Sequence, residues 1–268
     1  MKKKIIKAKI LNNKMITPDY FVMDLEASYL AKSSPGQFVN VKVQDLVTDP
    51  LLRIPLGIHR VKGKGKKEKG VALLYKVAGK GTEILSRRKK GEILDIIGPL
   101  GNGFDILPVK KKNSTAIIVA GGHGIAPLCF LAETLRANKT EVVFFIGTCG
   151  KKHVLLVKDL KKIGAEVHVA TEDGSFGCKG YVTKPLNDYL ERTTHDARRT
   201  TIYACGPRPM IKALKEVSDK FNIPAQVSID EYMACGIGAC KGCAVDTEEG
   251  IKMVCKDGPV FDIRTLKL

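Results

Sequence analysis

The second half of the chain alternates strand-like with helix-like segments, and this alternation constrains the fold more than any other feature. Apolar runs at 115–120, 141–148 and 200–205 each precede a segment with helical periodicity. Consecutive strands joined through helices form a parallel sheet, because each crossover returns the chain to the same edge. We therefore expect an α/β domain over residues 109–225.

Residues 1–108 have a different rhythm, with short strand-like segments separated by turns. Pro35-Gly36, the lysine- and glycine-rich stretch 63–70 and the stretch 98–103 supply these turns. Several short strands at this spacing predict an antiparallel barrel or sandwich. The remaining residues, 226–268, are few and rich in cysteine, so we expect three parts.

The chain is strongly basic, with a formal net charge of +17 over 268 residues. Its lysines are scattered in short groups without interleaved aromatic residues, and tryptophan is absent. This pattern favours a solvated surface, with an acidic partner or anionic nucleotide cofactors, over nucleic-acid binding. No apolar run is long enough for a membrane span, and the N-terminal apolar residues alternate with lysines as in a strand. We expect a cytoplasmic protein without a cleaved signal.

Four of the eight cysteines are crowded near the C-terminus with the spacing C-x4-C-x2-C-x11-C. Zinc sites usually present two close pairs, whereas three of these thiols share one loop, and the order is that of plant-type [2Fe–2S] proteins. Gly236, Gly238 and Gly242 would let the loop curl so that its N–H groups face the sulfurs. We predict a [2Fe–2S] cluster, with zinc or disulfides as alternatives. The predicted ligands are Cys235, Cys240, Cys243 and Cys255.

Two glycine turns follow strand-like segments in the α/β part. The first, "AGGHGIAPL", places glycines before a helix that we expect Pro127 to open, and the second is "CGPRPM" at 205–210. Ligands of parallel sheets bind at the carboxyl ends of the strands, where helix N-termini attract phosphate. We predict that both turns face one dinucleotide. A nicotinamide gives a hydride and a cluster carries single electrons, so a flavin is expected in the first domain as the converter.

The order of these parts resembles the electron transfer subunit of type B dihydroorotate dehydrogenase, within the ferredoxin reductase superfamily. The resemblance covers essentially the whole chain and is most specific in "MACGIGACKGC…VCKDGPVF". It implies FAD in the barrel, NAD(H) on the α/β domain and a [2Fe–2S] cluster. It also implies a partner catalytic subunit that contains FMN, in a heterotetramer that interconverts dihydroorotate and orotate in pyrimidine biosynthesis. No residue of this chain is assigned to dihydroorotate.

The resemblance also implies individual contacts. For flavin they are the turn 98–104 and Arg53, Ile54, Pro55, Leu56, Gly57, Leu74, Tyr75, Lys76, Gly81 and Thr82. For the nicotinamide nucleotide they are Gly121, Gly122, Gly124, Pro127, Cys205, Gly206 and Pro207.

The flavin strand departs from the family pattern R-P-x-S, because Ile54 and Gly57 replace the Arg and the Ser. Arg53 is one position away, but adjacent strand residues point to opposite faces. Other candidate sources of positive charge for the flavin pyrophosphate are Arg60, Lys76 and Lys80. Lys151 and Lys152 would suit the 2′-phosphate of NADP, although a solvated lysine pair is the simpler interpretation.

Three alternatives remain. The chain could be the electron-input subunit of another complex, such as a sulfhydrogenase or a ferredoxin:NADP transhydrogenase. It could be a basic, zinc-stapled RNA-binding module, or a scaffold subunit that keeps the cluster and has lost flavin.

Overall fold

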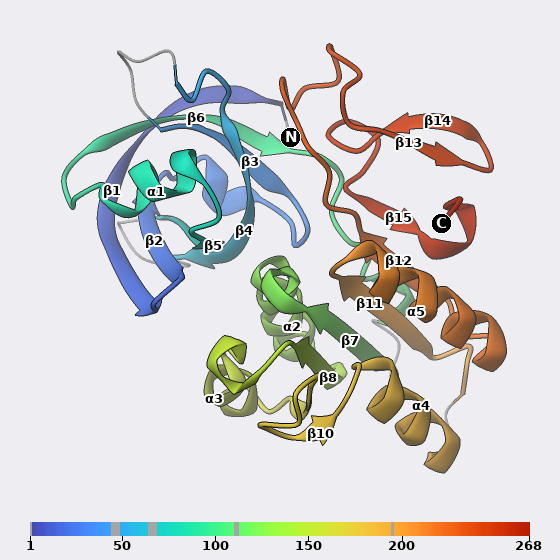
Figure 1. Cartoon of the computed structure of the whole chain (residues 1–268). Helices are drawn as coiled ribbons and strands as arrows, with labels where there is room; N and C mark the ends of the chain where they lie inside the picture. The colour runs from blue at the N-terminus through green and yellow to red at the C-terminus, as the bar shows by residue number, and fades with distance from the viewer. Residues whose placement is uncertain (1, 44–48, 64–68, 110–112, 194–195) are drawn as a thin grey trace. The chain divides into compact units, whose positions relative to one another are not determined.

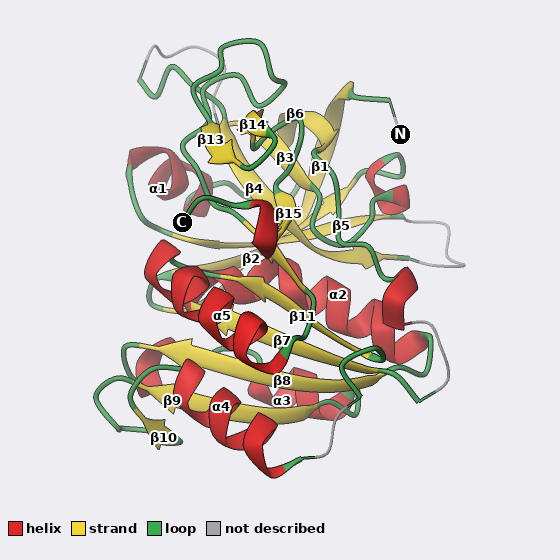
Figure 2. Ribbon diagram, turned by 90° about the vertical axis from the view of Figure 1, so that its right-hand side faces the viewer, coloured by secondary structure: helices red, strands yellow, loops and turns green. Residues whose placement is uncertain are grey.

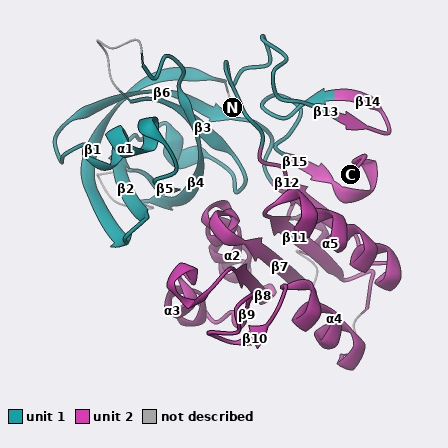
Figure 3. Cartoon of the chain, in the orientation of Figure 1, with its two compact units in different colours: residues 1–103, 231–245, 252–259 teal, residues 104–230, 246–251, 260–268 magenta. Residues whose placement is uncertain are grey.

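The computed structural model describes residues 2–43, 49–63, 69–109, 113–193 and 196–268 (Figure 1). The chain divides into two units: residues 1–103, 231–245 and 252–259 form the first, and 104–230, 246–251 and 260–268 form the second (Figure 3). The C-terminal segment is therefore shared between the units. The assignment of cofactors to domains bounded at residues 108 and 225 stays a prediction.

The first unit is built on a closed antiparallel barrel with the strand order β1-β2-β5-β4-β3-β6. Its strands are β1 (Lys4–Thr17), β2 (Tyr20–Glu26), β3 (Phe38–Lys42), β4 (Ile54–Lys62), β5 (Gly70–Lys76) and β6 (Ile93–Leu100). Fully buried side chains such as Ile10, Met23, Ile58 and Leu94 form its core. Of the two folds predicted for this region, an antiparallel barrel or a sandwich, the structure confirms the barrel. Most of the turn predicted at 63–70 lies outside the described residues.

The second unit contains a seven-stranded sheet with the order β10-β9-β8-β7-β11-β12-β15. Its parallel strands are β7 (Thr115–Gly121), β8 (Glu141–Thr148), β9 (Glu166–Thr171), β10 (Cys178–Lys179), β11 (Thr200–Cys205) and β12 (Ala225–Ser228). β15 (Val260–Asp262) pairs antiparallel with β12 at one edge. The predicted parallel sheet is confirmed.

Helices cover both faces of this sheet, α2 and α3 on one and α4 and α5 on the other (Figure 2). The bounds are α2 (Ile125–Ala137), α3 (Val157–Lys162), α4 (Thr183–Arg192) and α5 (Arg208–Phe221). From β7 the chain winds toward β8 and β9, whereas β11 leads to β12 on the other side. The strand order therefore reverses between β7 and β11, where doubly wound sheets bind ligands.

Several elements differ from the sequence prediction. Helix α1 (Lys80–Ser86) and the short strand β10 have no strong periodicity and were not predicted. The hairpin of β13 (Ala244–Thr247) and β14 (Gly250–Met253) agrees with the hairpin-like segment expected between Cys243 and Cys255. Pro127 is the third residue of α2, not its first. It is still tolerated there, because N–H groups of the first turn have no partner within the helix. No helix among the described residues is long and apolar enough to cross a membrane.

Candidate functional site

The cysteine loop directs main-chain N–H groups at its own sulfurs. Cys235 Sγ accepts hydrogen bonds from the N–H groups of Ile237 and Cys240, each at 3.4 Å. Cys243 Sγ accepts one from the Cys255 N–H, also at 3.4 Å. Such donors stabilise negative charge on sulfur, as a thiolate-ligated cluster requires. The prediction that this loop curls its N–H groups toward the thiols is confirmed.

The four thiols lie in two pairs, because the Cys235 and Cys240 side chains form a hydrogen bond with each other, and so do those of Cys243 and Cys255. The first pair is partly or fully exposed and the second is buried. Among the described residues no three His, Cys, Asp or Glu side chains converge on a site for one metal ion. Two pairs of thiolates suit a binuclear cluster, which has two irons to ligate.

The thiols differ in their tendency to ionise. Burial opposes ionisation of Cys235, but hydrogen bonds from Ile237 and Cys240 outweigh it and lower its pKa to about 6. Burial, together with the adjacent Cys243 thiol, raises the pKa of Cys255 to about 12. A positive centre between the thiols would offset both the burial and the repulsion that keep Cys255 protonated. The donor set therefore fits a cationic iron–sulfur centre.

The two glycine turns of the α/β unit meet at the carboxyl ends of β7 and β11. Ala120 pairs with Cys205 across the two strands. A Cβ at Gly121 would lie 2.7 Å from Pro207 Cδ, and a Cβ at Gly124 would overlap the Cys205 carbonyl oxygen. Glycine is thus required for the close approach of the two turns. The structure brings together the residues that sequence reasoning assigned to one nucleotide.

The open side of this junction is where a ligand can reach the main chain. A Cβ at Gly122, whose φ is +53°, would have no neighbour within 4 Å. His123 beside it contacts Asp230, with Nε2 and Oδ2 3.0 Å apart. Asp230 was not predicted, because it follows β12 and approaches the turns only through the parallel pairing of β11 and β12.

Burial and the negative charge of Asp230 raise the pKa of Cys205 to about 12. This thiol is therefore protonated at neutral pH and acts as a small apolar residue beside Gly206. Lys151 and Lys152 lie just after β8, in exposed positions on the same sheet edge.

Two of the predicted flavin segments lie together in the barrel unit. The Ile54 side chain packs over Gly81, where a Cβ would overlap it. Thr82 caps α1 by accepting hydrogen bonds from the Ala78 and Gly79 N–H groups at 2.9 and 3.2 Å. A Cβ at Gly79 would meet nothing within 4 Å, so a ligand can approach the main chain there.

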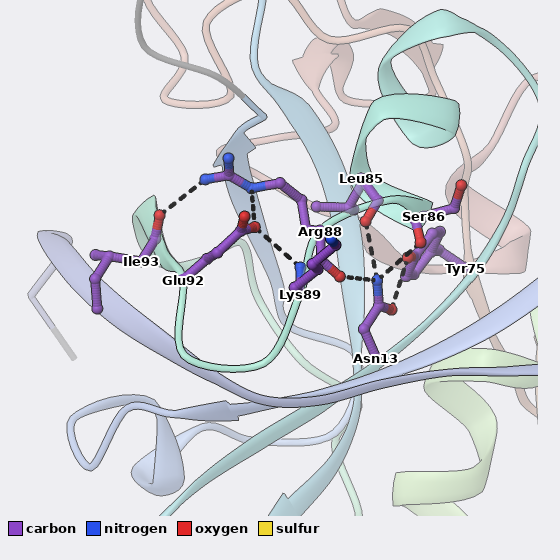
Figure 4. Close-up of polar contacts among 8 residues, drawn as sticks. All are labelled: Asn13, Tyr75, Leu85, Ser86, Arg88, Lys89, Glu92 and Ile93. Atoms are coloured by element: carbon purple, nitrogen blue, oxygen red, sulfur yellow. Dashed lines mark hydrogen bonds and ion pairs between the residues drawn. The ribbon is translucent and has the colours of Figure 1, made fainter.

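Tyr75 of β5 is hydrogen-bonded within the barrel. Its hydroxyl donates to Asn13 Oδ1 at 3.0 Å, and burial raises its pKa (Figure 4). Asn13 Nδ2 in turn donates to the carbonyl oxygens of Leu85 and Arg88, each at 3.0 Å. Asn13 thereby holds the end of α1 on the barrel. It was not predicted, because it is one polar residue within an ordinary exposed strand pattern.

The charged residues near the flavin strand have partners of their own. Arg53 forms a bond of 2.6 Å with Asp95 Oδ1 and donates to the Asp95 carbonyl oxygen at 2.9 Å. Lys80 pairs with Asp49, and Lys76 lies 6.0 Å from the centre of the Tyr20 ring. The Arg53 guanidinium is therefore bound to Asp95 of β6. The individual flavin contacts stay a prediction.

Comparison with protein-family models matches residues 230–267 to the iron–sulfur cluster binding domain of dihydroorotate dehydrogenase B. Residues 118–216 match the oxidoreductase NAD-binding domain. The electron transfer subunit of dihydroorotate dehydrogenase B (NAD(+)) from Desulforamulus reducens is 40% identical over 265 residues, covering 96% of each chain. The subunit from Caldanaerobacter subterraneus is also 40% identical, over 260 residues and 96% of each chain.

This chain belongs to the dihydroorotate dehydrogenase B electron transfer subunit family. As a member of that family it carries an iron–sulfur-binding region, which includes all four cysteines, and an NAD-binding region, which includes both glycine turns.

Solved structures extend the likeness. An NADH-dependent reduced ferredoxin-NADP oxidoreductase, described for flavin-based electron bifurcation, superposes with a TM-score of 0.83 at 30% identity, covering 97% of this chain and 89% of that one. The ferredoxin reductase of carbazole 1,9a-dioxygenase has a TM-score of 0.68 at 18% identity and covers 83% of this chain and 67% of its own. The latter supports the fold alone, that of a ferredoxin reductase.

Proposed function

We propose that this chain is the electron transfer subunit of a dihydroorotate dehydrogenase, using NADH in preference to NADPH. It binds FAD on the barrel, the nicotinamide nucleotide at the β7–β11 edge and a [2Fe–2S] cluster on the cysteine loop. Its partner is a catalytic subunit that contains FMN, and the assembly is a cytoplasmic heterotetramer. The partner's substrates are dihydroorotate and orotate.

The chain's own residues bind and position the redox groups. Cys235, Cys240, Cys243 and Cys255 would ligate the cluster, and the N–H groups of Ile237 and Cys240 would stabilise its charge. The turn containing Gly122 would receive the nucleotide, because its main chain is open on one side. A bound flavin supplies the change from a two-electron hydride to single electrons. No general acid or base is required, since orientation provides most of the acceleration.

The paired thiols with inward-directed N–H groups are the observation that carries this proposal. The experiment is anaerobic purification of the chain with its partner, followed by determination of FAD, iron, acid-labile sulfide and zinc. We expect FAD and two irons per chain, and orotate-dependent oxidation of NADH. A colourless preparation with one zinc and no sulfide would contradict the proposal.

A second function is supported by the 30% identity to the bifurcating ferredoxin-NADP oxidoreductase and by the unusual Ile54 and Gly57. In that case the partner would lack orotate-dependent activity, and oxidation of NADH would require reduced ferredoxin as a second electron donor and NADP+ as the acceptor. The higher identity of 40% to the dihydroorotate dehydrogenase subunits favours the first function.

A further inference from the structure

Asn40 is a polar residue within the apolar wall of the barrel. It lies between Val39 and Val41 on β3 and is fully buried. Its Nδ2 donates to the carbonyl oxygen of Cys235 at 3.2 Å, whereas its Oδ1 has no donor among the described residues. A buried amide with only one of its two polar atoms hydrogen-bonded makes the barrel less stable than an apolar residue of similar shape would. Its contribution therefore lies in the contact with the cysteine loop.

Asn40 also adjoins the predicted flavin strand. It lies opposite Pro55 in the antiparallel pair of β3 and β4. Residues directly opposite one another project from the same face of a sheet. Asn40 and Pro55 thus share the face of the wall that carries the cysteine loop, and the Asn40 side chain connects that wall to the main chain of Cys235, the first cysteine of the loop.

The loop is shaped to fit Asn40. Gly236 has a φ of +68°, and a Cβ there would lie 2.5 Å from Asn40 Nδ2. Both the backbone conformation and the close approach require glycine. The sequence motif explains glycine by loop curvature alone, and the contact with β3 is visible only in the structure.

Asn102 makes a second attachment at the other end of the thiol set. Its Nδ2 donates to the Asp257 carbonyl oxygen at 2.9 Å, and its N–H donates to the Gly258 carbonyl oxygen at 2.6 Å. These residues follow Cys255 directly. The segments that carry the first and the last thiol are therefore each held on the barrel unit by an asparagine.

We propose that Asn40 and Asn102 are positioning residues that hold the cysteine loop at a fixed separation from the flavin strand. This role rests on the proposed function for the bound groups, whereas the attachment is a property of the chain itself. Displacement of redox partners by about 1 Å can cost a large factor in rate. Asn40 has the larger effect, because its bond is buried and Asn102 is exposed.

The test compares Asn40→Leu, Asn102→Ala and a matched control in the full complex. Asn187→Ala is the control, because Asn187 Nδ2 also donates to a main-chain oxygen, that of Thr183 at 3.0 Å, within α4. The measurements are amide hydrogen exchange at residues 235–238 and 256–258, the EPR spectrum of the reduced cluster, and stopped-flow rates of flavin and then cluster reduction by NADH.

In Asn40→Leu we expect exchange at 235–238 to be about fivefold faster, the equivalent of one lost hydrogen bond. Cluster reduction should slow about 10-fold, as for other residues that orient metal ligands, with an altered EPR spectrum and an unchanged rate of flavin reduction. Asn102→Ala should give a smaller acceleration of exchange at 256–258 and a smaller change in the EPR spectrum; its flavin reduction is not used as a criterion, because Asn102 lies in the predicted flavin turn 98–104. Loss of the cluster with FAD retained also supports the proposal.

Exchange, EPR spectrum and cluster reduction that match Asn187→Ala in both variants would overturn the proposal. If Asn40→Leu loses FAD as well, Asn102→Ala decides alone, by the same criteria. Wild-type protein without iron or flavin would instead contradict the proposed function, and the exchange measurement would still test the attachment.

Discussion

The cysteine loop and the nucleotide edge are both rich in glycine, but for different physical reasons. In the loop, Gly236 and Gly238 have φ values of +68° and +88°, which side chains with a Cβ rarely adopt. At the nucleotide edge, Gly121 and Gly124 have ordinary φ values of −106° and −59°, and glycine is needed because the second turn leaves no room. One site depends on local conformation, and the other on the contact between two distant segments.

The largest expected effect is that of Gly236→Ala. The added Cβ is strained by the positive φ and meets Asn40, so we expect iron content to fall about 10-fold. Gly250→Ala is the matched control, because Gly250 has a φ of +94° and open space around it. Iron analysis of both complexes checks this. If both variants lose the same amount of iron, the contact between Gly236 and Asn40 has no effect of its own. The proposed difference between the two glycine-rich regions would then be contradicted.

Gly124→Ala should act on the stability of the second unit. Its Cβ would overlap main chain at Cys205, which cannot rotate away, so we expect a loss of about 2 kcal/mol in the free energy of unfolding. Gly122→Ala, with open space, should cost about 1 kcal/mol through its positive φ and should raise the KM for NADH. Urea unfolding and steady-state kinetics separate the two. If Gly122→Ala lowered the free energy of unfolding more than Gly124→Ala, close approach of the two turns would not be the reason for glycine at this edge.

The flavin strand is a third region, where the family's polar side chains are missing. Ile54→Arg should place a guanidinium beside Gly81, two residues from the open main chain at Gly79. We expect FAD to bind about 10-fold more tightly, through charge-assisted hydrogen bonds to the pyrophosphate. Fluorescence titration of deflavinated complex measures this affinity, with Ile93→Arg, at an exposed position of β6, as the control. Equal affinities would show that the pyrophosphate lies elsewhere.

The smallest effect on function is expected at the thiol of the nucleotide edge, where the prediction concerns chemical reactivity. Because the pKa of Cys205 is raised to about 12, at pH 8 it holds about 1,000-fold less thiolate than an ordinary thiol, and iodoacetamide should label it far more slowly than the exposed Cys149. The raised pKa means that the folded chain retains this proton. Its contribution to stability is therefore complete below about pH 8.5 and is lost as the pH rises toward 12. Peptide mass mapping across pH checks this, and fast labelling of Cys205 at pH 8 would contradict its burial.

Sequence reasoning succeeded where the signal is local and failed where a residue acts across the fold. The apolar runs at 141–148 and 200–205 predicted strands, and they match β8 and β11. Asn40 and Asp230 could not be found in this way, because nothing near them in sequence indicates what they contact. A polar residue in the apolar run "FVNVK" was the one available signal for Asn40. β10 and β15 were missed because these strands are short.

The spacing of the cysteines and the alternation of strands with helices determined the type of redox centre and the class of fold. Both properties arise from neighbours along the chain: N–H groups and thiols of one loop, and side chains on one face of one helix. Tertiary structure decided how the sites are completed, since the β7–β11 pairing joins two glycine turns that lie far apart in sequence. Tertiary structure also brings Asn40 of β3 into contact with Cys235, which is almost 200 residues away in sequence. Closure of the barrel decides this contact, because it fixes which strand the cysteine loop can reach.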